Sequence, residues 1–133
     1  MQDSKPSFIS GATTYKLIGI GMEIHRELGN GFLEILYKDA LEYELRQHKI
    51  PYERERKFEA HYKGIILPHC YYADFVINNE IILEVKAQNG IHEEAIPQVI
   101  NYLTLSKLPV GLILNFGEAS LRYKRLASPN NLR

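Results

Sequence analysis

The spacing of apolar residues changes twice along the chain, and these changes limit the folds that the chain can form. Between residues 14 and 48 the apolar positions recur every three or four residues, which is the period of a helix with one buried face. Between residues 57 and 87 they alternate among aromatic and β-branched residues, which is typical of strands. A helical spacing returns at residues 93–106, and two more strands follow. The predicted order is α-α-β-β-β-α-β-β, an α/β (α+β) arrangement.

Two helices are expected at the start of the chain. The first should end at the segment "LGNG", residues 28–31, because glycine commonly follows the end of a helix. The second should stop near His48, since helices usually end before a proline, here Pro51. The apolar stripe of this second helix is predicted to be Leu33, Leu36, Tyr37, Ala40, Leu41 and Leu45. The two helices should form a hairpin.

The final part of the chain predicts one helix and two strands of different kinds. Pro97 is compatible with the helix only in its first turn, where the missing N–H has no intrahelical partner. The segment "VGLILNF", residues 110–116, is an almost continuous apolar run and predicts a strand that is buried on both faces. The segment "LRYKRL", residues 121–126, predicts an edge strand.

The turn at residues 78–80 determines which side chains share a face of the sheet. If the hairpin loop held only Asn78 and Asn79, Asp74 would lie opposite Leu83, and a lone carboxylate would be buried on an apolar face. A three-residue loop that includes Glu80 avoids this cost and leaves one face wholly apolar. The pairs in that register are Ile77 with Ile81, Phe75 with Leu83, and Ala73 with Val85. We therefore predict the three-residue loop or an equivalent bulge.

The same register places Asp74 directly opposite Glu84, roughly 5 Å apart at Cβ, where two like charges destabilise each other. A divalent cation would compensate, since Mg²⁺ is commonly bound by one or two carboxylates with water and phosphate oxygens. Lys86 on the same face is too far along to neutralise both acids, but it could contact what the metal holds. The alternative is an ordinary exposed ion pair between Glu84 and Lys86, which would be energetically small.

Three further polar residues on helices are candidates for the same site. Glu34 shares a helical face with Tyr37 and should point inward, although a glutamate in a first turn can equally favour the helix dipole or cap back onto Gly31. Gln98 and Tyr102 are four residues apart and therefore lie on one side of their helix. From spacing alone, an amphipathic boundary is the favoured interpretation of this pair.

The whole chain limits the classes of partner. Its 133 residues, 45% of them hydrophobic, predict a single domain at residues 12–127 with loosely ordered tails at 1–11 and 128–133. The formal net charge is zero, so basic surface for nucleic acid must be local, at "RERK" (54–57) or "RYKR" (122–125), although both runs are compatible with solvated strands. A single cysteine, Cys70, and the absence of any apolar run of about 18 residues predict a cytoplasmic protein without a membrane segment.

The ordered set of motifs resembles the GxxExxY proteins, a group within the PD-(D/E)xK nuclease-like superfamily. The motifs are "GFLEILY", with Gly31, Glu34 and Tyr37 at the naming positions, then Asp74, "LEVKA", "QVINYL" and "VGLILNFG". The resemblance runs from about residue 15 to residue 126. It implies a restriction-endonuclease-like core, a mixed β-sheet flanked by helices.

The resemblance also implies roles for individual residues. Asp74 and Glu84 match the metal-binding acids, Lys86 matches the catalytic lysine, and Glu34 matches the helix glutamate that completes some of these sites. Gln98 and Tyr102 match a Gln-xxx-Tyr element, which implies substrate binding together with Lys86. The expected function is a Mg²⁺- or Mn²⁺-dependent nuclease, with DNA favoured over RNA. One departure is Ala73, which stands where the superfamily pattern has proline.

Two other functions are compatible with these residues. A nuclease-like scaffold can bind nucleic acid or protein without turnover, because a fold does not fix a function. A purely structural homo-oligomer is the third reading, and a homodimer is compatible with all three. His92 follows the Glu84 strand and could approach the site, although a solvated histidine at a helix start is the favoured interpretation.

Overall fold

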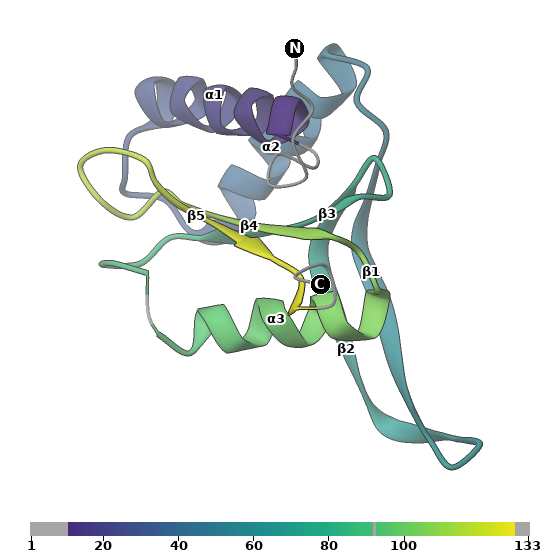
Figure 1. Ribbon diagram of the computed structural model, residues 1–133. Helices are drawn as coiled ribbons and strands as arrows, with labels where there is room; N and C mark the ends of the chain where they lie inside the picture. Colours follow the sequence, from purple (N-terminus) through teal and green to yellow (C-terminus); the bar gives the residue numbers. More distant parts are fainter. Residues whose placement is uncertain (1–10, 92, 130–133) are drawn as a thin grey trace.

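The structure, a computed structural model, describes residues 11–91 and 93–129, which form a central sheet with helices on both faces (Figure 1). The order of helices and strands is the predicted one. The elements are α1 (Gly11–Leu28), α2 (Glu34–Gln47), β1 (Tyr52–Tyr62), β2 (Ile65–Ile77), β3 (Ile81–Lys86), α3 (Ala95–Ser106), β4 (Val110–Asn115) and β5 (Arg122–Ala127). Pro97 lies in the first turn of α3, as its missing N–H requires.

The five strands follow the order β1-β2-β3-β4-β5, so β5 is the edge strand that the sequence predicts. The β3–β4 pair is parallel, and the other three pairs are antiparallel. Parallel strands need a long crossover connection, which α3 provides. The predicted mixed sheet flanked by helices is therefore confirmed.

Two apolar layers hold the helices against the sheet. The helices α1 and α2 cover one face and α3 covers the other (Figure 1). Leu17, Tyr37 and Leu83 belong to the first layer, and Val99 and Ile113 belong to the second. Every residue of β4 is buried, which confirms the strand predicted to be buried on both faces.

The apolar stripe of α2 is narrower than the sequence predicts. Tyr37, Leu41 and Leu45 are fully buried, but Leu33 is 79% exposed and Leu36 is 38% exposed. Leu33 precedes the helix and has an extended backbone, so its side chain does not continue the buried face. Leu36 is one residue from Tyr37 and therefore about 100° away around the helix.

The β2–β3 register confirms the three-residue loop, with Ile77 opposite Ile81 and Phe75 opposite Leu83. The prediction for Ala73 is wrong. Ala73 packs in the α3 layer, whereas Phe75 packs in the layer under α1 and α2. Two residues that are two apart would normally share a face, so the strand must bend between them.

The neighbouring strand β1 is also irregular at this point. Glu55, between the residues that pair with Ala73 and Phe75, has a φ of 56°, a left-handed conformation that interrupts the regular pleat. Among the described residues, regular β2–β3 pairing also ends at Phe75 and Leu83. Asp74 therefore sits at a local break in the sheet.

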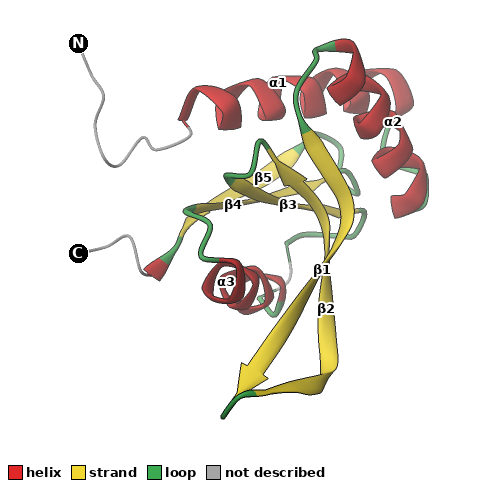
Figure 2. Cartoon of the chain, turned by 90° about the vertical axis from the view of Figure 1, so that its right-hand side faces the viewer, coloured by secondary structure: helices red, strands yellow, loops and turns green. Residues whose placement is uncertain are grey.

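Residues 11, 128 and 129, which the sequence assigns to the tails, are within the described part of the chain. Gly11 begins α1, and the buried Ser128 donates its backbone N–H to the carbonyl of Pro109 at 2.8 Å. The rest of the predicted tails, residues 1–10 and 130–133, lies outside the described residues. The β1–β2 hairpin projects well beyond the rest of the sheet (Figure 2). No helix in the described part of the chain is long and apolar enough to cross a membrane.

Candidate active site

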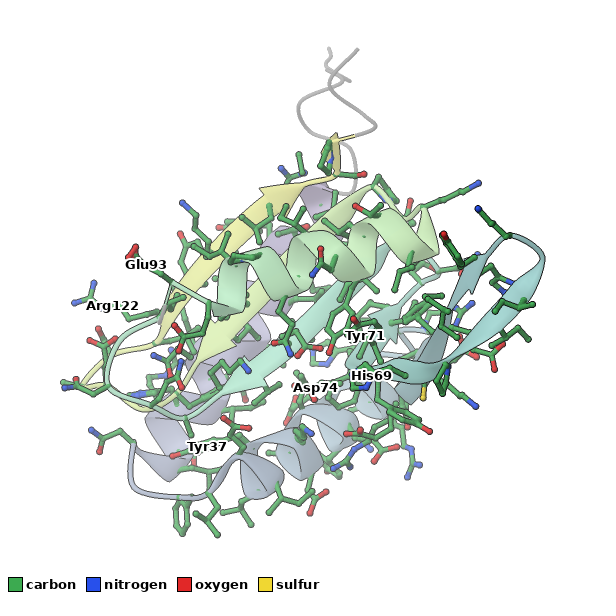
Figure 3. All side chains as sticks on the ribbon, turned by 90° about the horizontal axis from the view of Figure 1, so that it is seen from below. Tyr37, His69, Tyr71, Asp74, Glu93 and Arg122 are labelled. Atoms are coloured by element: carbon green, nitrogen blue, oxygen red, sulfur yellow. The ribbon has the colours of Figure 1, made fainter. Side chains whose placement is uncertain are left out.

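Asp74 and Glu84 lie on adjacent strands where the regular pairing stops, and each carboxylate binds the backbone of the other strand. Glu84 Oε2 accepts a hydrogen bond from the Asp74 N–H at 2.8 Å. Asp74 Oδ2 accepts a hydrogen bond from the Val85 N–H at 2.8 Å. The side chains thus satisfy backbone donors that have lost their strand partners. The structure brings the two predicted acids together (Asp74 is labelled in Figure 3).

Glu84 is an unusual residue for its surroundings, because it is an acid that is only 4% exposed. Burial, and next the charge of Asp74, raises the pKa of Glu84 to about 8. Among the described residues, no hydrogen bond reaches its second oxygen, Oε1. A half-satisfied buried carboxylate is costly unless a cation or proton compensates it.

Glu34 reaches the same region from α2. It is the first residue of the helix, and its Oε2 accepts a hydrogen bond from the Ala87 N–H, just after β3, at 3.3 Å. The contact across 53 residues places a third carboxylate at the end of β3. Glu34 therefore points inward, as one of the two interpretations of the sequence predicts.

Tyr37 fixes the loop that precedes Glu34. Its hydroxyl donates to the carbonyl of Gly29 and accepts a hydrogen bond from the Phe32 N–H at 3.2 Å. Its ring stacks on Phe116 with the ring centres 4.6 Å apart. These contacts close the α1–α2 loop on the core and set the point where α2 begins, and hence the place of Glu34.

Lys86 and Gln98 meet in a pocket of about 300 Å³ between the end of β3 and the start of α3. Its lining residues are Lys86, Gln88, Glu94, Ala95 and Gln98. Lys86 and Gln98, both predicted site residues, therefore line the same pocket. No ion pair within 4.0 Å reaches the Lys86 ammonium from any part of the chain that the structure describes.

Tyr102 lies away from this pocket. It is 4% exposed, and its hydroxyl donates to the carbonyl of Tyr72 at 3.2 Å. Burial, and next the charges of Glu84 and Asp74, raises the pKa of Tyr102 to about 12. Its contacts join α3 to β2 just before Asp74, so the hydroxyl supports the strand and does not face the pocket.

Lys38 is a site residue that the sequence analysis missed. Its ammonium lies 2.9 Å from Asp74 Oδ1 and 2.9 Å from Glu55 Oε2, with only 14% of its side chain exposed. Its spacing gave a signal, because Lys38 is one helical turn after Glu34 and therefore on the same side of α2.

Asn115 is a second missed residue, fully buried at the end of β4 opposite Lys86. Its Oδ1 accepts a hydrogen bond from the Gln88 N–H at 3.1 Å, and its Nδ2 donates to the carbonyls of Gln88 and Gly90, both at 3.0 Å. This side chain holds the segment that follows Lys86. Its signal was a lone amide within an apolar run.

Gly117 allows the same segment to approach β4 closely. A Cβ at this position would lie 2.3 Å from the backbone nitrogen of Gln88. Such a distance is far inside van der Waals contact, so only glycine fits without a shift of the backbone.

Several basic residues of the two predicted basic segments are paired with acids. Arg54 lies 2.8 Å from both Asp39 and Glu42, and Arg56 lies 2.9 Å from Glu53. Arg122, on the edge strand, lies 3.8 Å from Glu118. The basic residues of the segment "RERK" therefore have acidic partners within the protein.

The donor set fits a divalent cation held by few protein ligands. No group of three or more His, Cys, Asp or Glu side chains is arranged to hold a metal within residues 11–91 and 93–129. However, Mg²⁺ typically uses one or two carboxylates and keeps several waters. Glu84 Oε1, which is buried beside Asp74 and has no hydrogen-bond partner in the described part of the chain, matches this need. His92 lies outside the described residues.

A family model of the PD-(D/E)XK nuclease superfamily matches residues 11–126. This chain belongs to the PD-(D/E)XK nuclease superfamily. Enzymes of this superfamily are nucleases and generally use divalent metal ions. No curated protein matches the chain.

A solved structure supports the fold of this superfamily member. The crystal structure of SSO0001 is similar with a TM-score of 0.59 and 19% sequence identity. The match covers 93% of this chain and 63% of that chain, so this chain spans less than two thirds of its length. At this identity the likeness shows the fold, and the predicted restriction-endonuclease-like core is confirmed.

Proposed function

We propose that this protein is a nuclease that hydrolyses phosphodiester bonds with Mg²⁺ or Mn²⁺ bound at Asp74 and Glu84. The observation that carries the proposal is the carboxylate pair on adjacent strands, with one buried oxygen of Glu84 lacking a hydrogen bond among the described residues. A bound divalent cation would supply a Lewis acid and an acidified water there. Such a cation would also offset the repulsion between the two acids.

The remaining residues have distinct tasks in this proposal. Glu34 adds a carboxylate at the end of β3, where it could complete the cation site or orient water. Lys86 places an ammonium in the pocket, where it would bind a phosphate oxygen and stabilise the charge that develops in the transition state. Gln98 would orient Lys86 or a phosphate oxygen. Tyr102 would act as a positioning residue through β2, and not as a direct substrate contact.

We further propose that the chain is a GxxExxY protein with DNA as its substrate. The motif residues Gly31, Glu34 and Tyr37 support the group assignment, since Tyr37 closes the loop that positions Glu34. Residues 12–127 would act as one domain, in the cytoplasm, and a homodimer would allow a domain this small to cover more of a duplex.

Cleavage assays test the proposed reaction. Labelled duplex DNA, single-stranded DNA and RNA should be incubated with Mg²⁺, Mn²⁺ or EDTA. Wild type should cleave DNA only with metal, Glu84→Gln and Asp74→Asn should abolish cleavage, and Lys86→Ala should slow it by about a hundredfold or more. Glu27→Gln, on the exposed side of α1, is the matched control and should cleave normally. If cleavage survived the loss of Glu84 and Lys86 in folded variants, the assigned site would be wrong.

A non-catalytic binding module is the second candidate. The observation that favours it is the pairing of Lys38 with Asp74, which gives one proposed metal ligand an internal partner. This function predicts binding of nucleic acid or protein without cleavage of any of the three substrates.

A further inference from the structure

In the described part of the structure, Lys38 is the only lysine that forms an ion pair with a proposed metal ligand. Its ammonium contacts Asp74 Oδ1 and Glu55 Oε2 at the same distance, 2.9 Å. Both the Lys38 and the Asp74 side chains are largely shielded from water, with 14% and 13% exposed. Charge pairs that are shielded in this way interact more strongly than exposed pairs.

The two acids hold the lysine in its charged form. Burial favours the neutral amine, but the hydrogen bonds and charges of Glu55 and Asp74 together raise the pKa of Lys38 above 10.5. Lys38 therefore compensates an acidic site in the metal-free protein. Glu84 places a second carboxyl group beside Asp74.

The two partners of Lys38 are not equivalent. Asp74 is tied to β3 through the Val85 N–H, and it is a proposed metal ligand. Glu55 is half exposed, and it occupies the irregular position of β1 that faces the break in β2. Glu55 can therefore keep the ammonium when Asp74 binds another cation, which reduces the cost of the exchange.

We propose that Lys38 is a tethered counter-ion of the metal site, which binds Asp74 in the metal-free protein and keeps only Glu55 when a divalent cation is bound. This inference rests on the proposed function, in which Asp74 and Glu84 hold the cation. Lys38 is then a positioning residue with two opposed effects. It stabilises the metal-free protein, and it weakens the affinity for the cation because like charges repel.

These opposed effects separate the proposal from a purely structural role. If Lys38 only supported the fold, its removal would lower both the stability and the metal affinity. A lysine that only oriented Asp74 for the metal would also lower the affinity. If Lys38 is a counter-ion, by contrast, its removal lowers the stability of the metal-free protein and raises the affinity for the cation.

The test measures Mn²⁺ and Mg²⁺ binding by calorimetry and the Tm in EDTA, for wild type, Lys38→Met, Lys38→Arg and Arg46→Met. Methionine keeps the length of the chain and removes the charge. Arg46 is the matched control, since it carries a positive charge on the same helix but pairs with Glu42 and Tyr52. Lys38→Met should melt at a lower temperature in EDTA and bind Mn²⁺ about tenfold more tightly, which corresponds to about 1.4 kcal/mol.

The conservative variant Lys38→Arg and the control Arg46→Met should both keep the metal affinity of wild type. Lys38→Arg should bind the metal as wild type does, because it retains the charge, and Arg46→Met should leave the affinity unchanged. Equal or weaker Mn²⁺ binding by Lys38→Met would overturn the inference, provided that wild type binds the metal and Asp74→Asn does not. If wild type itself bound no metal, the proposed metal site would fail and the role of Lys38 would fail with it.

A measurement on wild type covers the case in which Lys38→Met does not fold. In protein with ¹³C-labelled lysine, the Lys38 Cε signal should move on Mg²⁺ titration and saturate at the affinity found by calorimetry. The Lys16 signal, from α1, serves as the internal control and should not move. A Lys38 signal that stayed fixed while Mg²⁺ bound would overturn the inference.

Discussion

Glu84 and Asp74 are joined by a hydrogen bond in which the backbone N–H of Asp74 donates to the Glu84 carboxylate at 2.8 Å. This contact draws a carboxylate into the core, where burial and the charge of Asp74 raise its pKa. This pair of acids leads to two predictions, one on how stability and one on how the proposed metal binding should depend on pH.

Stability should fall as the pH rises through the range set by Glu84. The folded protein retains the Glu84 proton up to about pH 8, whereas the unfolded chain loses it near 4.5, so the unfolded state binds fewer protons in between. The free energy of unfolding should therefore decrease over this window, by at most about 1.4 kcal/mol per pH unit from this group. Urea denaturation from pH 5 to pH 9 would measure it. Glu84→Gln should remove this component of the slope, and an unchanged slope in the variant would contradict the assignment.

Metal binding should strengthen over the same pH window. A divalent cation needs the ionised carboxylate, so it must displace the proton that Glu84 retains below about pH 8. Calorimetry of Mn²⁺ binding in buffers of different ionisation enthalpy should detect proton release at pH 6.5 that disappears near pH 9. Affinity that did not change between these two pH values would show that Glu84 does not hold the cation.

Tyr37→Phe should weaken the link between the α1–α2 loop and the site. The substitution keeps the ring that stacks on Phe116 but removes the hydroxyl that binds Gly29 and Phe32. Loss of these hydrogen bonds should cost about 1–3 kcal/mol of unfolding free energy, measured by urea denaturation. Tyr43→Phe, on the exposed side of the same helix, is the control and should be close to neutral. Equal stability of both variants would refute this role for the Tyr37 hydroxyl.

Gly117→Ala should destabilise the protein and disturb the segment that follows Lys86. The new Cβ would meet the Gln88 backbone at 2.3 Å, and backbone cannot yield as a flexible side chain can. We expect a loss of about 1–3 kcal/mol, the usual range for overpacking, together with slower cleavage. Gly19→Ala, within α1 and with open space around it, should instead stabilise by up to about 1 kcal/mol. Thermal denaturation of the two variants should show shifts of opposite sign.

The sequence predicted the elements and part of the register because both depend on local patterns. Apolar spacing located α1 and α2, and the need to avoid a lone buried carboxylate selected the loop that pairs Ile77 with Ile81. Glu34, Lys86 and Gln98 were found through the motifs, and the fold brings them to the ends of β3 and α3.

Other features depend on residues that are distant in sequence, so no local pattern could predict them. Glu55 of β1 has a left-handed backbone, and beside it in β2 Ala73 packs in the α3 layer. Lys38 and Asp74 are 36 residues apart in the sequence, and their ion pair forms only because α2 lies over the local break in the sheet. Asn115 could be recognised as a lone polar residue in its strand, but its partners come from the loop after β3.

The sequence by itself determined which chemical groups this nuclease-superfamily protein carries and the order of the elements that hold them. Only the tertiary structure decided which charges meet: Glu84 with the backbone of Asp74, and Asp74 with Lys38. The physical reason is that periodicity assigns a side chain to a face of its own helix or strand. The cost and compensation of a buried charge depend on what the opposite element brings to that face.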